Sequence, residues 1–177
     1  MKKRLGLIQM DVHVNDVEYN YNRVQELLTQ ALAECPDIIV LPETWNTGFH
    51  PSKDLINISD RNGERTKALL SAFSKEHNVN IVGGSVAVAK EDLIFNTSYA
   101  YNREGTLVGE YSKMHGFSPA KENQYFASGT HTTHFELDGI PCSTVICYDI
   151  RFPELVRMAA LSNTELLFVP AQWPTMR

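Results

Sequence analysis

The chain has 177 residues, of which 43% are hydrophobic and 21% are charged, and its formal net charge is −5. This length suits one domain with a sizeable core, and the composition is ordinary for a globular protein. The negative net charge argues against a nucleic-acid surface, because phosphate binding requires clustered Lys and Arg side chains. No apolar run is long enough for a membrane span.

The N-terminal part of the chain predicts a strand, a helix and a second strand. Residues 5–10 predict a short strand, because polar residues end the apolar run too early for a secretory signal peptide. We therefore expect a cytoplasmic protein. Residues 18–33 predict a helix with apolar residues at helical spacing, and Asp16 is placed to cap its start. The apolar run of "DIIVLPE", residues 37–43, predicts a strand buried on both faces.

The middle of the chain predicts a loop, a helix and a broken strand. The loop covers residues 44–62, and the helix covers residues 64–77. The strand covers residues 78–88 and is interrupted at Gly83–Gly84. These two glycines lack the spacing and the following Lys of a phosphate-binding loop, so they do not predict a nucleotide site.

The rest of the chain predicts more strands and one further helix. In order, these are a hairpin of residues 93–101 and 106–111, an irregular polar loop at 116–132, paired strands at 135–137 and 142–146, a helix at 153–161 and a last strand at 165–171. The order predicts a layered α/β protein in which helices cover the faces of sheets. Without repeats or linkers, the simplest interpretation is one domain.

Neither a disulfide framework nor a metal site is predicted. The three cysteines, Cys35, Cys142 and Cys147, are irregularly spaced and form no C-x-x-C pair. His131 and His134 lie in a Thr-rich polar stretch without acidic or thiol partners, which favours an exposed loop over a zinc site. We therefore expect chemistry that needs no metal.

Three chemically capable side chains follow predicted strands. They are Glu43 after "IIVLP", Lys113 after "LVGEYS" and Cys147 after "STVI". In α/β folds the carboxyl ends of strands face a common crevice, so these three side chains can converge there. Together they meet the needs of acyl transfer from an amide. The thiol is a nucleophile, the carboxylate moves protons, and the ammonium stabilises an oxyanion.

Each of these residues taken alone also has a structural interpretation. Cysteine is among the most buried residue types, so Cys147 can be a core residue at a strand end. Glu43 can cap a helix or face solvent, and Lys113 can be a solvated strand terminus. The residues alone leave both interpretations open.

Three segments favour the catalytic interpretation. "LPETW" around Glu43, "YSKMH" around Lys113 and "VICYDIRFPE" around Cys147 resemble, in order, the signature segments of the nitrilase (carbon–nitrogen hydrolase) superfamily. The resemblance runs from residue 5 to the end of the chain. It implies a four-layer αββα sandwich, a Glu–Lys–Cys triad, no cofactor and a homo-oligomer, such as a dimer. Members of the family are longer, so residues 1–177 are expected to be a single domain lacking its C-terminal part, either as a fragment or as a truncated protein.

The resemblance also implies a role for each site residue. Glu43 is the general base and acid, Lys113 supports the oxyanion, and Cys147 is the nucleophile at a sharp strand-to-helix turn. The backbone N–H of Tyr148 is the second oxyanion donor. Glu122, in the loop after the lysine, matches a further glutamate that orients the substrate or Lys113. Its alternative is a solvated loop residue, because "HGFSPAKEN" departs from the common pattern of that loop.

"CYDIRFPE", "GSVAV" and "AQWPTMR" are most similar to the omega-amidase branch, whose members act on 2-oxo acid amides such as 2-oxoglutaramate. Arg151 is a candidate to bind the substrate carboxylate, with an internal salt bridge to Asp149 or Glu154 as the alternative. Further candidates that line the pocket are Trp173, Arg177 and Phe49.

Function is thus predicted as cysteine-dependent hydrolysis of a small amide, with release of ammonia through a thioester. The partners expected are the amide substrate and water. One alternative within the superfamily is an N-carbamoyl amidohydrolase or a nitrilase. Another, of a different class, is an inactive remnant that acts only in assembly. A nucleotide-binding α/β domain is a distant alternative.

Overall fold

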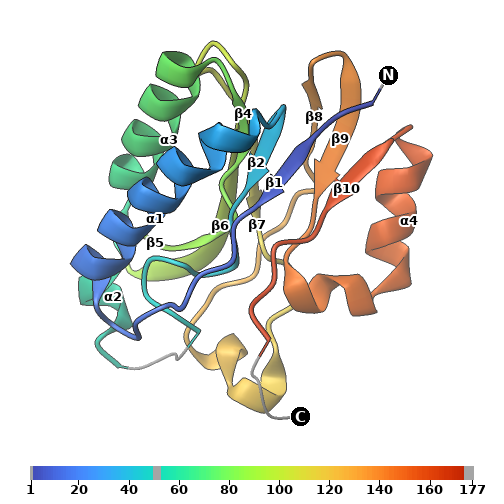
Figure 1. Ribbon diagram of the computed structural model, residues 1–177. Helices are drawn as coiled ribbons and strands as arrows, with labels where there is room; N and C mark the ends of the chain where they lie inside the picture. Colours follow the sequence, from blue (N-terminus) through green and yellow to red (C-terminus); the bar gives the residue numbers. More distant parts are fainter. Residues whose placement is uncertain (1, 50–52, 174–177) are drawn as a thin grey trace.

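The computed structural model describes residues 2–49 and 53–173, which are arranged in four layers (Figure 1). Helices α1 (Val17–Ala31) and α3 (Glu64–His77) cover one face of the larger of two sheets. The other face packs against a smaller sheet, and α4 (Pro153–Leu161) covers the outer side of that sheet. The αββα order implied by the family resemblance is therefore confirmed.

Among the described residues, the larger sheet has seven strands. Its order is β1 (Leu5–Leu7), β2 (Ile38–Val40), β4 (Asn80–Val82), β6 (Leu93–Tyr101), β5 (Val86–Lys90) and β3 (Asp60–Arg61), with β7 (Leu107–Ser112) also on β6. Strands β1, β2 and β4 are parallel, whereas β6 is antiparallel to β4, β5 and β7. Strands β4 and β5 pair with successive parts of β6, so they form one strand that is interrupted at residues 83–85. The predicted break at Gly83–Gly84 is confirmed.

In the described part of the chain, the smaller sheet has three strands, in the order β10 (Leu166–Phe168), β9 (Ile140–Thr144) and β8 (His134–Leu137). Strands β8 and β9 form the predicted hairpin, turning at Asp138 and Gly139 with positive φ angles of 50° and 78°. Strand β10 is parallel to β9, and the connection between them runs through the short helix η4 (Cys147–Arg151) and α4.

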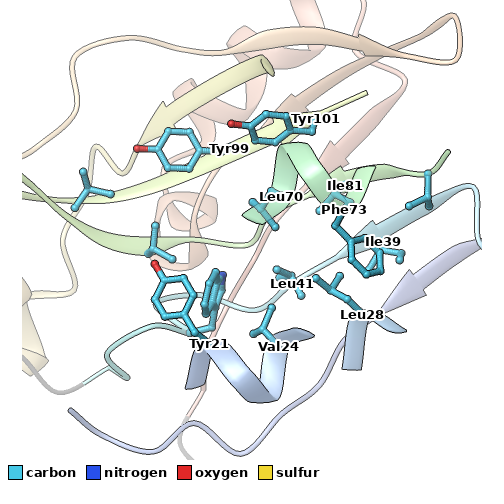
Figure 2. Packing of buried hydrophobic residues seen from close by; sticks show 14 residues of the cluster. Tyr21, Val24, Leu28, Ile39, Leu41, Leu70, Phe73, Ile81, Tyr99 and Tyr101 are labelled. Atoms are coloured by element: carbon cyan, nitrogen blue, oxygen red, sulfur yellow. The ribbon is translucent and has the colours of Figure 1, made fainter. Parts of the chain in front are cut away.

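The hydrophobic core has two main parts, one on each face of the larger sheet. Ile39 and Ile81 pack toward α1 and α3, together with Leu28 and the other side chains shown in Figure 2. Ile38 and Val82 pack in the opposite direction, toward the smaller sheet. Successive side chains of a strand point to opposite faces, so the apolar run of β2 is buried on both sides, as predicted.

The helices agree with their sequence signals. The Asp16 carboxylate accepts the backbone N–H of Tyr19 at 3.1 Å, which confirms the predicted cap of α1. This helix ends at Ala31, before the predicted end, because Leu32–Glu34 form a tighter turn that the left-handed residue Cys35 closes. Among the described residues, no helix is long and apolar enough to cross a membrane.

The prediction of an uninterrupted loop over residues 44–62 is wrong. Its second half contains the short helix α2 (Leu55–Ile58) and strand β3. Leu55 is buried against Ala87 and Ile94, and this burial holds the segment on the sheet. The Asp60 carboxylate also accepts two backbone N–H groups of α3, so the segment is bonded to the helix that follows it.

Candidate active site

Glu43, Lys113 and Cys147 come together at one end of the strands. They follow β2, β7 and β9, respectively, and all three are buried. Lys113 Nζ donates to Glu43 Oε1 at 2.8 Å. The Glu43 carboxylate also lies close enough to the Cys147 thiol to raise the pKa of that thiol. Three groups that are far apart in sequence therefore form one contiguous cluster around the Glu43 carboxylate.

The position of Glu43 depends on close contact with the interruption between β4 and β5. Ser85 N–H donates to the Pro42 carbonyl at 3.0 Å. Gly84, with φ of +60°, lies so close that a Cβ there would be 2.0 Å from the Pro42 oxygen. Only glycine allows this approach, so Gly84 permits the contact that holds the segment carrying the glutamate.

The Lys113 backbone is fixed on both sides. Its N–H donates to the Asn96 carbonyl of β6, and its carbonyl accepts the Gly129 N–H, both at 2.8 Å. The side chain therefore starts from a fixed point and reaches two carboxylates. Nζ lies 2.8 Å from Glu43 Oε1 and 2.8 Å from Glu122 Oε2.

Glu122 is a member of the cluster, and its interpretation as a solvated loop residue is wrong. It lies in the short helix η3 (Glu122–Gln124), within the predicted irregular loop, and its side chain is fully buried. Besides contacting Lys113, its carboxylate accepts the Phe117 backbone N–H at 2.7 Å. The buried ion pair explains why the loop folds inward: this carboxylate and the Lys113 ammonium each need a partner away from water.

Cys147 lies at a sharp turn after β9. Its φ of 48° is in the left-handed region, which is uncommon for a residue with a side chain and is found at functional turns. Its N–H donates to the Pro170 carbonyl at 2.9 Å. The turn leads directly into η4, so the cysteine sits at a strand-to-helix turn of the predicted kind, and the Tyr148 N–H comes next along the chain.

Asp149 stabilises this turn through hydrogen bonds to both neighbouring segments. Its fully buried carboxylate accepts the Ile146 N–H at 3.0 Å and the Tyr111 hydroxyl at 2.7 Å. Its other oxygen accepts the His115 backbone N–H at 2.9 Å and contacts the ring Nδ1 of the same residue at 2.8 Å. One carboxylate thereby joins the segment that carries Cys147 to the segment on either side of Lys113.

Burial sets the protonation states of the cluster. It raises the pKa of Glu43, an effect that the Lys113 ammonium opposes. It lowers the pKa of Lys113, but the charges of Glu43 and Glu122 outweigh it and leave the pKa above its ordinary value. Burial and the adjacent Glu43 carboxylate raise the pKa of Cys147 to about 12. The resting thiol is therefore protonated at neutral pH, and the Glu43 carboxylate is the nearby acceptor for its proton.

A cavity of about 1110 Å³ opens onto Cys147, with Phe49, Tyr148, Arg151 and Trp173 in its lining. The guanidinium of Arg151 lies 5.8 Å from the Trp173 ring centre. Among the described residues, it forms no ion pair with Asp149 or Glu154, so the alternative of an internal salt bridge is wrong.

The remaining site candidates lie as follows. Lys113 Nζ is 5.4 Å from the Phe49 ring centre, so this ring borders both the cavity and the cluster. Arg177 lies outside the described residues. Among the described residues, no group of three or more His, Cys, Asp or Glu side chains is arranged to hold a metal ion.

Three site residues were not found from the sequence. Asn96 donates to two carboxylates, Gln172 donates its backbone N–H to Glu43 Oε2 at 3.1 Å, and Asp149 supports the turn. An available signal for Asn96 was an amide in the middle of the apolar strand "LIFNTSYAY". Asp149 was considered only as a partner of Arg151, and nothing in the sequence singles out Gln172.

Comparisons with known proteins agree with this geometry. A model of the carbon–nitrogen hydrolase family matches residues 4–177. The chain is 36% identical over its whole length to a 2-oxoglutaramate amidase of Bacillus subtilis (strain 168) and covers 68% of that protein. Over 96% of its length it is 30% identical to an omega-amidase of Danio rerio, of which it covers 63%.

The solved structures agree on the fold. A cysteine-to-alanine variant of the amidase from Nesterenkonia sp. AN1, in complex with butyramide, matches with a TM-score of 0.85 at 22% identity. The match covers 96% of this chain and 65% of that one. The chain thus spans about two thirds of the length of these three relatives.

Proposed function

The chain belongs to the carbon–nitrogen hydrolase family, and on that premise we propose that residues 1–177 form one domain carrying the machinery of a cysteine amidase. The observation that carries the proposal is the buried ion pair of the Glu43 carboxylate with the Lys113 ammonium, beside the Cys147 thiol whose pKa the carboxylate raises. A proton acceptor, a cation and a nucleophile in one buried cluster beside a cavity suit acyl transfer.

In the first half of the reaction, Cys147 Sγ attacks the carbonyl carbon of the bound amide. Glu43 takes the thiol proton during the attack, because a thiol with a pKa of about 12 does not ionise beforehand. The carbonyl oxygen becomes an oxyanion, which Lys113 Nζ and the Tyr148 N–H stabilise. Glu43 then returns the proton to the nitrogen, the carbon–nitrogen bond breaks, and ammonia leaves a thioester on Cys147.

In the second half, water attacks the thioester carbon. Glu43, ionised again, accepts a proton from the water, and the same two donors stabilise the second oxyanion. The carbon–sulfur bond breaks, the carboxylic acid departs, and the thiol regains its proton. Lys113 keeps its charge throughout, because Glu43 and Glu122 stabilise the ammonium.

The proposed substrate is the ω-amide of a 2-oxo acid, such as 2-oxoglutaramate. Two relatives with 36% and 30% identity bear the names 2-oxoglutaramate amidase and omega-amidase. Such a substrate carries a carboxylate remote from its amide. The exposed Arg151 guanidinium lines the cavity and is chemically suited to bind that carboxylate with two parallel hydrogen bonds.

The test is ammonia release from 2-oxoglutaramate by the parent chain and by a Cys147→Ala variant. The parent is expected to release ammonia, and the variant is expected to lose at least a thousandfold in rate while melting cooperatively. Cys35→Ala is the matched control, because Cys35 is exposed and outside the cluster. Equal rates for parent and Cys147→Ala would refute the proposal.

A panel of amides, N-carbamoyl amino acids and nitriles tests the substrate class. Preference for either of the last two would replace the 2-oxo acid amide with another substrate of the same superfamily. A folded parent chain that turns over none of them would favour the remaining alternative, an inactive protein that acts only in assembly.

A further inference from the structure

Asn96 lies at the centre of the catalytic cluster, although no step of the proposed reaction uses it. It is in the middle of β6, opposite Ala87 of β5, and only 1% of its surface is exposed. Burying an amide this completely costs folding free energy unless the amide is hydrogen-bonded. The hydrogen bonds that Asn96 makes therefore indicate its role in the cluster.

The side-chain amide of Asn96 bridges two carboxylates. Nδ2 donates to Glu43 Oε1 at 3.0 Å and to Glu122 Oε1 at 3.1 Å. The same two oxygens accept from Lys113 Nζ, at 2.8 Å and 3.0 Å. Two donors and two acceptor oxygens therefore alternate in a closed ring.

This ring reduces the electrostatic repulsion between the two buried carboxylates. Two buried carboxylates that share a single ammonium repel each other, and one of them tends to take up a proton. A base that is already protonated cannot accept the thiol proton. Lys113 neutralises one negative charge, and the neutral Asn96 amide adds a hydrogen bond to each carboxylate without adding charge. Hydrogen bonds donated to an ionised carboxylate favour that ionised form.

Two further contacts point in the same direction. The Asn96 backbone carbonyl accepts the Lys113 N–H at 2.8 Å, so one residue orients the lysine as well as the two glutamates. No donor among the described residues reaches Asn96 Oδ1. The Asn96 amide therefore contributes its two N–H donors to the site, while its Oδ1 stays an unpaired buried acceptor, which costs free energy.

We infer that Asn96 is a positioning residue, which holds Glu43 and Glu122 in place around Lys113 and favours the ionised form of Glu43, so that Glu43 can receive the Cys147 proton. The inference rests on the proposed function. The charged and titratable groups that face Asn96 from the packed elements are Glu43, Lys113 and Glu122, with Cys147 behind Glu43.

The test measures how the reactivity of Cys147 depends on pH. Iodoacetamide alkylates the parent chain over a range of pH, and peptide mapping separates Cys147 from Cys35 and Cys142. The acid limb, the low-pH part of the profile in which the Cys147 alkylation rate rises with pH, gives the apparent pKa of the first proton lost from the thiol–carboxylate pair. The same limb is measured in kcat/KM for 2-oxoglutaramate.

In Asn96→Ala, the acid limb is expected to move about one to two pH units upward, because each carboxylate loses a donated hydrogen bond. Asn96→Asp fills the same volume and is expected to move the limb further, since it places a third carboxyl beside the other two. Asn80→Ala is the matched control. Asn80 is a fully buried amide of β4 that donates to the Asp37 carbonyl, away from the cluster. The acid limb of Asn80→Ala should lie at the same pH as that of the parent chain.

A folded Asn96→Ala whose acid limb matches the parent would overturn the inference. If that variant does not melt cooperatively, Asn96→Asp supplies the test. If neither variant folds, Asn96 has a structural role only, and the inference is wrong. A parent chain that hydrolyses no amide removes the proposed function, but the alkylation profile still decides whether Asn96 controls the carboxylates.

Discussion

Substitution of Gly84 by Ala should impair catalysis as well as folding. Gly84 has φ of +60°, a conformation that costs a residue with a side chain about 1–2 kcal/mol. The added Cβ would also lie 2.0 Å from the Pro42 oxygen and 2.7 Å from the Leu41 carbonyl carbon. Both atoms belong to the backbone that carries Glu43. That backbone must move by about 1 Å, a displacement that can lower a rate about a hundredfold.

Gly139→Ala is the matched control. Gly139 also has a positive φ, of 78°, but a Cβ there would meet nothing within 4 Å. Both variants should therefore lose about 1–2 kcal/mol of unfolding free energy to backbone strain, with a further loss of about 1–3 kcal/mol from overpacking in Gly84→Ala.

Urea unfolding gives the free energies of these variants, and ammonia release from 2-oxoglutaramate gives kcat/KM. Gly84→Ala should lose about a hundredfold in kcat/KM, whereas Gly139→Ala should retain the parent value. Equal kcat/KM in the two variants would refute the argument that Gly84 positions the glutamate.

Three further outcomes are expected. Asp149→Asn should lower the free energy of unfolding by about 3 kcal/mol, because its amide nitrogen would face donors that a carboxylate satisfies. Arg151→Ala should raise KM for 2-oxoglutaramate about tenfold and leave KM for butyramide unchanged, since butyramide has no carboxylate. In the parent chain, the acid limb of kcat/KM should lie above pH 4.5, the ordinary pKa of Glu, because burial raises the pKa of Glu43 and the base must be ionised to act.

Each of these outcomes has a direct check. Chemical unfolding measures the Asp149 effect, and Tyr111→Phe, which removes one of the four contacts, should lose less than Asp149→Asn. Steady-state kinetics with both amides measures the Arg151 effect, and an equal rise of KM for both would exclude carboxylate binding. A pH profile with its acid limb at or below 4.5 would contradict the electrostatics described for Glu43.

Local patterns were sufficient to predict most of the fold. Apolar periodicity located α1 and α3, and a run of apolar residues located β2. The glycine pair predicted the interruption after β4, because few other residues punctuate a strand so strongly. Helix α2 and strand β3 were missed because long-range burial of Leu55, and not a local pattern, determines them.

The candidate site was predictable only in part. Cys147 could not be distinguished from a core residue until Glu43 and Lys113 were considered with it, in segments that match a family. Asn96 and Gln172 have no such segment. Their roles come from where the sheet and the final loop place one amide and one backbone N–H, which is information about the fold and not about local sequence.

The central claim is that an acyl group is carried by Cys147. Acid quenching during steady-state hydrolysis of 2-oxoglutaramate, followed by peptide mass spectrometry, measures this directly. We expect the mass of the peptide containing Cys147 to increase by that of the 2-oxoglutaryl group, with no such increase at Cys35 or Cys142. Ammonia release at the full rate without any acyl adduct on Cys147, under conditions in which a model thioester survives the quench, would contradict the account.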